Sequence, residues 1–426
     1  MRINKRLAAF ALVGVTLATL TACGRADAGP AEGGGAEDIS DGPATGSLTV
    51  WAMGAEGENL DKLTKTFEEQ NPDVEVEVTA VPWGSAHDKF IAAIASGTTP
   101  DVAQVGTTWM GEFAGLNALD PVPAQIDDSV FFEGANATNL VDGVSYGVPW
   151  YVETRVVFYR TDIAEAAGIT EPPTDWDGLH DMAAAMRTQP GVDWGISLQP
   201  GGTGSWQTLL PFMWQAGGDI TNDALTEFTF DSPENADALS YYQSFFTDGL
   251  ADSAPTEGTT EADFVDGRVP MFISGPWMIG SVEALGGEGF ADEYGVAVMP
   301  SAEKEASFVG GSNLGVFSNT KNRDAAWKLV QFLTEEETQA SWFDIVGDLP
   351  SVKGAWTTDA LKSDEKLAVF GTQLETAKAP PSITTWEQIA TSLDAQVEAV
   401  TKTGSDPAEA LRAVQQEATS IGFGGE

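Results

Sequence analysis

Cysteine and histidine are nearly absent from this chain of 426 residues, which contains one cysteine and two histidines. The cysteine is Cys23, and the histidines are His87 and His180. So few of these residues exclude a disulfide framework, a zinc–thiolate centre, a multi-histidine metal site and, after Cys23, a cysteine nucleophile. We therefore expect the protein to use neither a metal ion nor a cofactor.

Basic residues are also scarce, because 21 lysines and arginines stand against 64 aspartates and glutamates, and the formal net charge is −43. An acidic surface of this kind repels the phosphates of nucleic acids and acidic lipid head groups. We expect no nucleic-acid partner and a ligand that is not a polyanion. The same acidity also suits the solubility of a secreted protein.

Several enzyme motifs are missing as well. The chain has no GxxxxGK[ST] phosphate loop and no GxGxxG after a strand, and the segment 310–314 lacks the last glycine of a G-x-S-x-G elbow. Neither histidine begins an HExxH motif. Paired carboxylates for glycoside hydrolysis stay open as an alternative, because 64 acidic residues allow many pairs.

The N-terminal segment has the pattern of a secretory signal. Residues 1–22 begin with three basic residues, continue with an uncharged apolar run and end in Leu-Thr-Ala directly before Cys23. This arrangement predicts a lipoprotein signal peptide over 1–22 and lipidation of Cys23. Residues 23–46 are rich in Gly, Ala, Asp and Glu, and this composition predicts a disordered tether. We expect the protein to be extracytoplasmic, anchored by lipid to the outer face of the cell membrane.

Strand and helix patterns alternate from Ser47 onward, where we expect the fold to begin. Strands are predicted at 48–51, 74–78 and 102–105, with helices around 60–67 and 90–94. Alternation of this kind predicts a parallel α/β sheet, whose ligands bind beyond the carboxyl ends of the strands. The loops at those ends are 52–59 and 106–110.

Further elements follow along the chain. Strands are predicted at 148–159 and 269–273, and helices at 163–168 and 176–186. Capping boxes are predicted at Thr334 with Glu337 and at Asp406 with Glu409.

Tryptophan is abundant, with 13 residues, and several lie in loops or at strand ends. Indole faces can stack on the C–H faces of a sugar ring, while Asn, Thr, Asp and Glu bind its hydroxyl groups. A tryptophan that fills the core is the competing interpretation at each position.

Five segments in order resemble the extracytoplasmic solute-binding proteins of ATP-driven importers, in the carbohydrate group that includes maltose-binding protein. The segments are 47–51 with 67–72, 94–102, 147–154, 273–277 and 308–313. The resemblance covers nearly all of 47–425. It implies an α/β, type II periplasmic-binding-protein-like fold of two lobes joined by hinge crossings, with the ligand cleft between them. Lobe 1 would comprise 47–154 and 312–358, and lobe 2 would comprise 155–311 and 359–426.

The same resemblance implies a set of ligand-binding residues: Glu56, Thr107, Thr108, Trp109, Glu153, Arg155, Trp206, Asp219, Trp277, Asn313 and Trp386. Trp83 and His87 are weaker candidates, because structural roles explain them equally well. The loop 53–58 lacks the acid-plus-lysine pair of maltose-binding protein, which argues against maltose itself.

The resemblance thus implies a monomeric, non-enzymatic receptor that binds an oligosaccharide and delivers it to the transmembrane subunits of an ABC-type permease. Two alternatives stay open. One is a secreted glycosidase, and the other is the same receptor fold with a polyol or another solute as ligand.

Overall fold

The computed structural model describes residues 38–256 and 258–424, so the predicted signal peptide, Cys23 and most of the predicted tether lie outside the described residues. The fold begins earlier than Ser47. Ala44 is fully buried, and its N–H donates to Asn71 Oδ1 at 2.8 Å. The N–H of Ser40 donates to Asp324 at 2.6 Å. The end of the predicted tether is therefore packed and hydrogen-bonded, because its few apolar residues reach the core.

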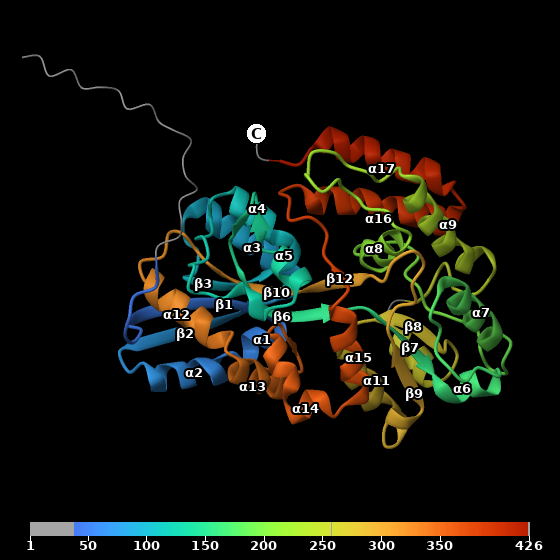
Figure 1. The fold of residues 1–426 in the computed structure, drawn as a ribbon, viewed down its shortest axis with the longest axis horizontal. Helices are drawn as coiled ribbons and strands as arrows, with labels where there is room; N and C mark the ends of the chain where they lie inside the picture. Colours follow the sequence, from blue (N-terminus) through green and yellow to red (C-terminus); the bar gives the residue numbers. More distant parts are fainter. Residues whose placement is uncertain (1–37, 257, 425–426) are drawn as a thin grey trace, which may run out of the picture. The chain divides into compact units, whose positions relative to one another are not determined.

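The larger sheet has seven strands in the order β11-β6-β10-β3-β1-β2, with β12 paired to β10 (Figure 1). Its strands are β1 (Gly46–Met53), β2 (Val74–Val81), β3 (Val102–Gly106), β6 (Val148–Thr154), β10 (Ser307–Val316), β11 (Leu349–Pro350) and β12 (Ala377–Lys378). β1 pairs in parallel with β2 and β3, whereas β10 is antiparallel to β3 and β6. The parallel α/β sheet predicted for the first third of the chain is confirmed.

Helices cover both faces of this sheet. One face packs on α2 (Asp61–Gln70), α12 (Arg323–Leu333) and α13 (Glu336–Val346) through Phe67, Trp327 and Trp342. The other face packs on α3 (Trp83–Ser96) and α4 (Met110–Gly115) through Phe90 and Phe113. Each such side chain contributes about 1.5–3 kcal/mol by leaving water. Two further segments, α1 (Gly54–Asn59) and the 3-10 turn η1 (Thr107–Trp109), follow the carboxyl ends of β1 and β3.

A second sheet has three antiparallel strands in the order β8-β7-β9. They are β7 (Val156–Arg160), β8 (Met271–Ser274) and β9 (Tyr294–Ala297). Around it and in the adjoining core lie α6 (Thr161–Ala166), α7 (Trp176–Arg187), α8 (Trp206–Gln215), α9 (Pro233–Thr247), α10 (Thr260–Val265), α11 (Trp277–Gly286), α15 (Glu365–Leu374), α16 (Trp386–Thr403) and α17 (Pro407–Ile421). The shorter elements are α5 (Glu133–Ala137), α14 (Asp359–Lys362), the pair β4 (Leu140–Val141) and β5 (Val144–Ser145), η2 (Asp128–Val130), η3 (Phe290–Asp292) and η4 (Lys353–Thr357).

The strand predicted over 148–159 is in fact two strands that belong to different sheets. β6 pairs with β10 and β11, whereas β7 pairs with β8 and β9. Arg155 is the one residue between them, and its carbonyl accepts a hydrogen bond from Ser307 Oγ at 2.7 Å. The apolar pattern continues through the break because both strands are buried, so the pattern did not reveal the change of sheet.

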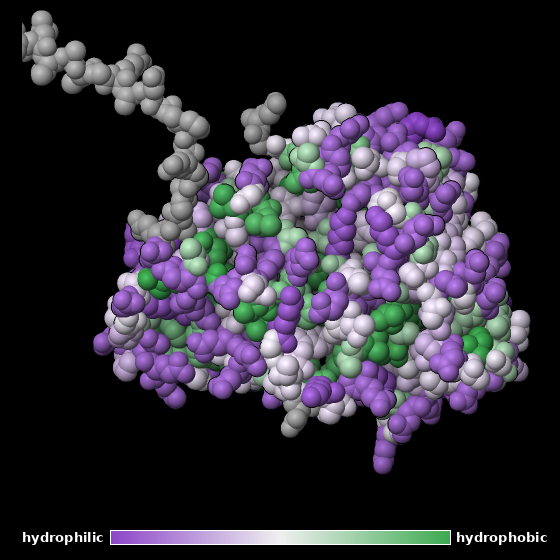
Figure 2. Space-filling model, viewed as in Figure 1, coloured by the Kyte–Doolittle hydropathy of each residue, from purple (hydrophilic) through white to green (hydrophobic). Residues whose placement is uncertain are grey.

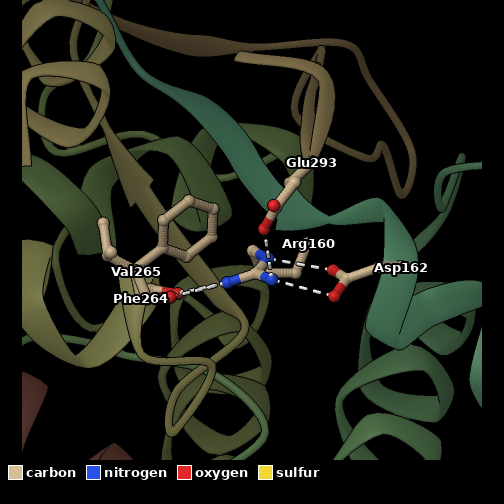
Figure 3. Close-up of polar contacts among 5 residues, drawn as sticks. All are labelled: Arg160, Asp162, Phe264, Val265 and Glu293. Atoms are coloured by element: carbon tan, nitrogen blue, oxygen red, sulfur yellow. Dashed lines mark hydrogen bonds and ion pairs between the residues drawn. The ribbon is translucent and has the colours of Figure 1, made fainter. Parts of the chain in front are cut away.

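Arg160, the last residue of β7, connects the second sheet to neighbouring segments by hydrogen bonds and ion pairs (Figure 3). Its Nε and Nη2 donate to the two carboxylate oxygens of Asp162 at 2.9 and 2.8 Å, and Nη2 also donates to Glu293 at 2.9 Å. Nη1 donates to the carbonyls of Phe264 and Val265 at 3.2 and 2.8 Å. Every guanidinium nitrogen therefore has a partner, although the residue is only 6% exposed.

One of the two predicted capping boxes is wrong. The hydroxyl of Thr334 donates to the Val330 carbonyl at 2.9 Å at the end of α12, and α13 begins two residues later without a side-chain cap. The Thr334 hydroxyl thus forms a hydrogen bond at the end of α12 and does not cap the start of α13. The other prediction is confirmed at its N-cap, because Asp406 accepts from the Glu409 N–H at 2.9 Å.

Hydrophilic side chains dominate the face shown in Figure 2, and hydrophobic side chains gather there only in small separate patches. In the described ranges 38–256 and 258–424, no helix combines the length and the apolar character needed to cross a membrane.

Candidate functional site

A cavity of about 500 Å³ lies beside the carboxyl ends of β1 and β3. From the larger sheet and the segments next to its strands it is lined by Glu56, Trp83, Gly106, Thr107, Thr108, Trp109, Tyr151, Glu153, Phe308, Gly310, Gly311 and Asp348. From α8 and α11 it is lined by Gln207 and Trp277. The predicted loops 52–59 and 106–110 both contribute, as the rule for parallel sheets requires.

A second cavity, of about 640 Å³, shares Tyr151, Glu153, Trp277 and Asp348 with the first. The two cavities adjoin at these four residues and are together called the cleft below. Volumes of this order are typical of sites for small molecules and leave room for a ligand of more than one ring.

Exposed indoles form part of the cleft wall. Trp83 is 41% exposed and Trp277 is 47% exposed, and the rings of Trp83 and Trp109 lie 6.1 Å apart at 59°. Trp109 is backed by His87, whose ring is 5.3 Å away, and by Phe113 at 6.2 Å. Such indoles keep unfavourable contact with water until a ligand with flat apolar faces covers them.

His87 supports this wall from behind. Its Nε2 lies 2.7 Å from Glu112 Oε2. His87 does not line the cavity, so it positions Trp109 rather than facing a ligand.

The orientation of Trp277 depends on two neighbours. A Cβ at Gly275 would overlap the indole ring, so only glycine leaves room for it there. The Arg155 guanidinium lies 4.9 Å from the ring centroid, in cation–π contact. The ring is thus held in place while nearly half of its surface stays open.

Glu56 belongs to a buried polar network centred on Gln104. Gln104 is fully buried; its Nε2 donates to Glu56 Oε1 at 3.3 Å, to Ser312 Oγ at 3.1 Å and to the Tyr151 hydroxyl at 3.4 Å. Its Oε1 accepts from the Met53 N–H at 2.6 Å. The side-chain amide of Gln104 therefore holds Glu56 and Tyr151 of the cleft in position.

Glu153 and Arg155 form an ion pair at 3.3 Å beside the cleft. Arg155 Nη2 also donates to Gln207 Oε1 at 2.8 Å, whereas its Nη1 is buried and has no hydrogen-bond partner among the described residues. A Cβ at Gly310 would come within 2.6 Å of Glu153 Oε1, so this glycine gives the carboxylate its space. Gly311 has φ +116°, and a Cβ there would overlap the Tyr151 carbonyl.

The acidic side chains gathered in the cleft change the pKa values of their neighbours. Burial, and after it the charge of Glu56, raises the pKa of Asp348 well above its ordinary value, against the hydrogen bond donated by Trp342 Nε1 at 3.0 Å. Burial, followed by the charges of Glu56 and Asp348, likewise raises the pKa of Tyr151 well above its ordinary value. In the described part of the chain, no three His, Cys, Asp or Glu side chains are grouped so that they could hold a metal ion.

Six of the predicted ligand-binding residues line the cleft: Glu56, Thr107, Thr108, Trp109, Glu153 and Trp277. Arg155 stands directly behind it and contacts Glu153, Gln207 and Trp277. Trp83, a weaker candidate in the sequence, also lines it.

The structure does not bring the other four to the cleft. Trp206 and Trp386 are 5% and 1% exposed and pack edge to face, with ring centroids 5.0 Å apart, because α8 and α16 turn them into the core. Asn313 is 1% exposed, and its Nδ2 donates to Thr138 Oγ1 at 3.0 Å. Asp219 forms an ion pair with Lys378 away from the cavity.

Several cleft residues were not predicted, namely Tyr151, Gln207, Asp348 and the buried Gln104. Two of them carried a signal. Tyr151 alternates with Glu153 along a strand whose other side chains are buried, so both face the same side. Gln104 is a polar residue within a strand of which every residue is buried, which requires a polar partner.

The chain is similar to known proteins along most of its length. Residues 52–340 match the family model described as bacterial extracellular solute-binding protein. The galactooligosaccharide-binding protein of Bacillus subtilis is 24% identical over 432 residues, covering 96% of each chain. The diacetylchitobiose binding protein DasA of Streptomyces coelicolor is 25% identical over 431 residues, covering 97% of each. The structure of the sugar-binding protein MalE from Xanthomonas citri superimposes with a TM-score of 0.83 and 32% identity, covering 88% of this chain and 97% of that one.

Proposed function

Because the chain belongs to the family of bacterial extracellular solute-binding proteins, we propose that it is an extracytoplasmic receptor for a sugar or oligosaccharide. The receptor binds its ligand in the cleft and delivers it to the transmembrane subunits of an ATP-driven importer. One observation carries the proposal: exposed indoles and carboxylates meet in one cavity of a chain that resembles named sugar-binding proteins over nearly its whole length.

The cleft offers both kinds of contact that a sugar ring needs. Trp83, Trp109 and Trp277 cover its C–H faces. The carboxylates of Glu56 and Glu153 accept hydrogen bonds from its hydroxyl groups, and Gln207 and the threonine hydroxyls of η1 exchange further ones. Each bond contributes about 0.5–1.5 kcal/mol net. Selectivity comes from the buried acids, which lose their hydration and gain partners only when the right hydroxyls are present.

Binding is coupled to closure of the two lobes about the chain crossings. We keep the predicted bounds, 47–154 with 312–358 and 155–311 with 359–426, as part of this proposal, except that lobe 1 begins before Ser47, because Ala44 is already buried. The passage of the chain from β6 into β7 at Arg155 supports the first boundary. A ligand that contacts both lobes favours the closed state by its differential affinity for that state.

The named relatives are binding proteins, not enzymes. We propose that this chain also performs no chemistry and that its cleft acids act as hydrogen-bond acceptors. Incubation of the purified protein with any saccharide that it binds should release no new reducing ends.

A binding screen tests the receptor function directly. The purified chain is heated with each member of a panel of neutral mono-, di- and trisaccharides and polyols, and every hit is titrated by calorimetry. A ligand at 100 times its Kd that binds only the folded state stabilises it by about 2.7 kcal/mol. A raised midpoint with one saccharide class supports the proposal, whereas no shift with any carbohydrate contradicts it.

We further propose that the receptor is a monomer held at the outer face of the cell membrane by lipid on Cys23. Support comes from the sequence Leu-Thr-Ala-Cys after an apolar run. A Cys23→Ser chain should be released from the membrane fraction, and the mass of the wild-type N-terminal peptide should include a lipid. An unmodified Cys23 in the membrane fraction would contradict the anchor.

A further inference from the structure

The cleft is richer in negative charge than in positive charge. Asp364 lines the second cavity only. Glu56, Glu153 and Asp348 line the first, and among the described residues the cation that pairs with these three acids is Arg155. Arg155 is already engaged by Glu153 at 3.3 Å and by Gln207 at 2.8 Å, and its guanidinium stacks on Trp277. One acid is thus balanced by this cation, and the other two have no basic partner among the described residues.

These carboxylates keep most of their accepting capacity free. Glu56 accepts from the Gln104 amide alone, at 3.3 Å, and Asp348 accepts from the Trp342 indole alone, at 3.0 Å, among the described residues. An ionised carboxylate has about four lone-pair positions for hydrogen-bond donors. Glu56 is only 7% exposed, so water replaces few of the missing donors. The cleft therefore favours a ligand that brings donors and positive charge.

Electrostatics inside the cleft is stronger than at an open surface. Charges in a partly dehydrated recess interact through a lower effective dielectric constant and are little screened by salt. The raised pKa of Asp348, caused by burial and by the charge of Glu56, reflects this like-charge environment. A carboxylate on the ligand would meet the same repulsion, and an ammonium group would relieve it.

We propose that the cleft selects saccharides by charge, so that an amine-bearing saccharide binds more tightly than its neutral counterpart and a carboxylate-bearing one binds most weakly. This inference rests on the proposed function and names the ligand class within it. Glu56 is the main selecting residue, because it is the buried acid without a cation.

The test uses three disaccharides that share one linkage, namely that of the neutral saccharide with the highest affinity in the screen. They are built from glucosamine, glucose and glucuronic acid, and each is titrated by calorimetry at neutral pH and moderate salt. We expect the amine to bind at least tenfold more tightly than the neutral sugar and the acid at least tenfold more weakly. Equal affinities, or a preference for the acid, would overturn the inference.

Two variants with the same change of charge locate the effect. Glu56→Gln keeps an oxygen acceptor in the cleft and should reduce the ratio between amine and acid affinities at least tenfold. Glu77→Gln, on an exposed position of β2 that lines no part of the cleft, should leave the ratio unchanged. If both variants change it equally, the net charge of the protein selects the ligand, and the local inference is wrong.

The outcomes also separate this inference from the proposed function. If no neutral saccharide binds, the receptor function itself fails. If neutral saccharides bind but the three disaccharides do not follow the expected order of affinity, the receptor function stands and only the charge selection fails.

Discussion

Two buried arginines at the two ends of β7 show how differently one residue type is used. Arg155 directly precedes the strand and Arg160 ends it, and they are 7% and 6% exposed. Arg160 has five hydrogen bonds, two of them to backbone carbonyls (Figure 3). Arg155 has one hydrogen bond and one ion pair, and its Nη1 has no partner among the described residues.

Each arginine also lies over an aromatic ring. The guanidinium of Arg160 is 5.2 Å from the ring of Phe290, which is 4% exposed. That of Arg155 lies between two rings, 5.3 Å from the buried ring of Phe308 and 4.9 Å from the ring of Trp277, which is 47% exposed. The difference teaches that a saturated buried cation over a buried ring holds the fold together. We propose that the unsaturated cation at Arg155, which contacts the open ring of Trp277, serves the ligand site instead.

The largest expected effect is on the free energy of unfolding, and it comes from replacing Arg160, whose guanidinium nitrogens all have partners. Arg160→Met removes the side-chain donor from the Val265 carbonyl and leaves the Phe264 carbonyl with the Gly267 N–H alone, at 3.0 Å, and it should lower the free energy of unfolding by about 3 kcal/mol. Asp162 and Glu293 are about half exposed and can be hydrated, which keeps the cost below that of a fully buried pair. Urea denaturation measures the loss. Saccharide affinity of the folded variant should not change, and a fall in affinity would contradict the division of roles.

The next largest effect is on saccharide affinity, and it comes from replacing Trp277, the exposed ring beside Arg155. Trp277→Ala removes about 80 Å² of stacking surface, worth about 2 kcal/mol, so the affinity for the saccharide should fall about 30-fold. Calorimetric titration measures it. The matched control is Phe290→Ala, which should destabilise the fold without weakening binding. A Trp277→Ala protein with wild-type affinity would show that this ring is not part of the site.

Arg155→Met sharpens the comparison between the two arginines that flank β7. It should reduce affinity about tenfold, because Trp277 and Glu153 lose the group that orients them, yet it should cost less stability than Arg160→Met. Calorimetric titration and urea denaturation give an affinity and a free energy of unfolding for each of the two variants, Arg155→Met and Arg160→Met. The comparison breaks if Arg155→Met is the more unstable of the two.

The smallest effect is a dependence on pH. The pKa of Asp348 is raised by burial and by Glu56, so its contribution to stability is full below the ordinary pKa and is lost as pH rises through the raised one. Asp348→Asn should therefore equal wild type near pH 4 and exceed its unfolding free energy at neutral pH. Asp162→Asn should instead lower stability at neutral pH, because Asp162 pairs with Arg160. Denaturation curves at the two pH values decide between these signs.

Much of the fold followed from the sequence, because local patterns determine it. The alternation of strands and helices after Ser47 predicted the parallel pairing of β1, β2 and β3. The hydrophobic pattern did not reveal the break at Arg155, since β6 and β7 are equally apolar and differ only in partners that lie more than a hundred residues away; a lobe boundary there followed from the family resemblance alone. Thr334 was misassigned because its hydroxyl can serve the end of one helix or the start of the next.

The site was predictable where topology fixes it. Glu56 and Thr107 to Trp109 follow parallel strands, and strand ends of this kind meet at one edge of a sheet. Trp206 and Trp386 could not be separated from Trp277, because each begins a helix and the sequence does not say which way the first turn faces. Asp348 reaches the cleft through contacts between distant segments, which no local pattern records.

The most direct test of the account is a calorimetric titration of the double variant Trp83→Ala/Trp277→Ala against the saccharide that the wild-type protein binds best. Both rings are more than 40% exposed, so the variant should unfold close to the wild-type midpoint. The account predicts a loss of affinity of at least a hundredfold in this folded protein. Wild-type affinity in the double variant would contradict the claim that the cleft is the sugar-binding site.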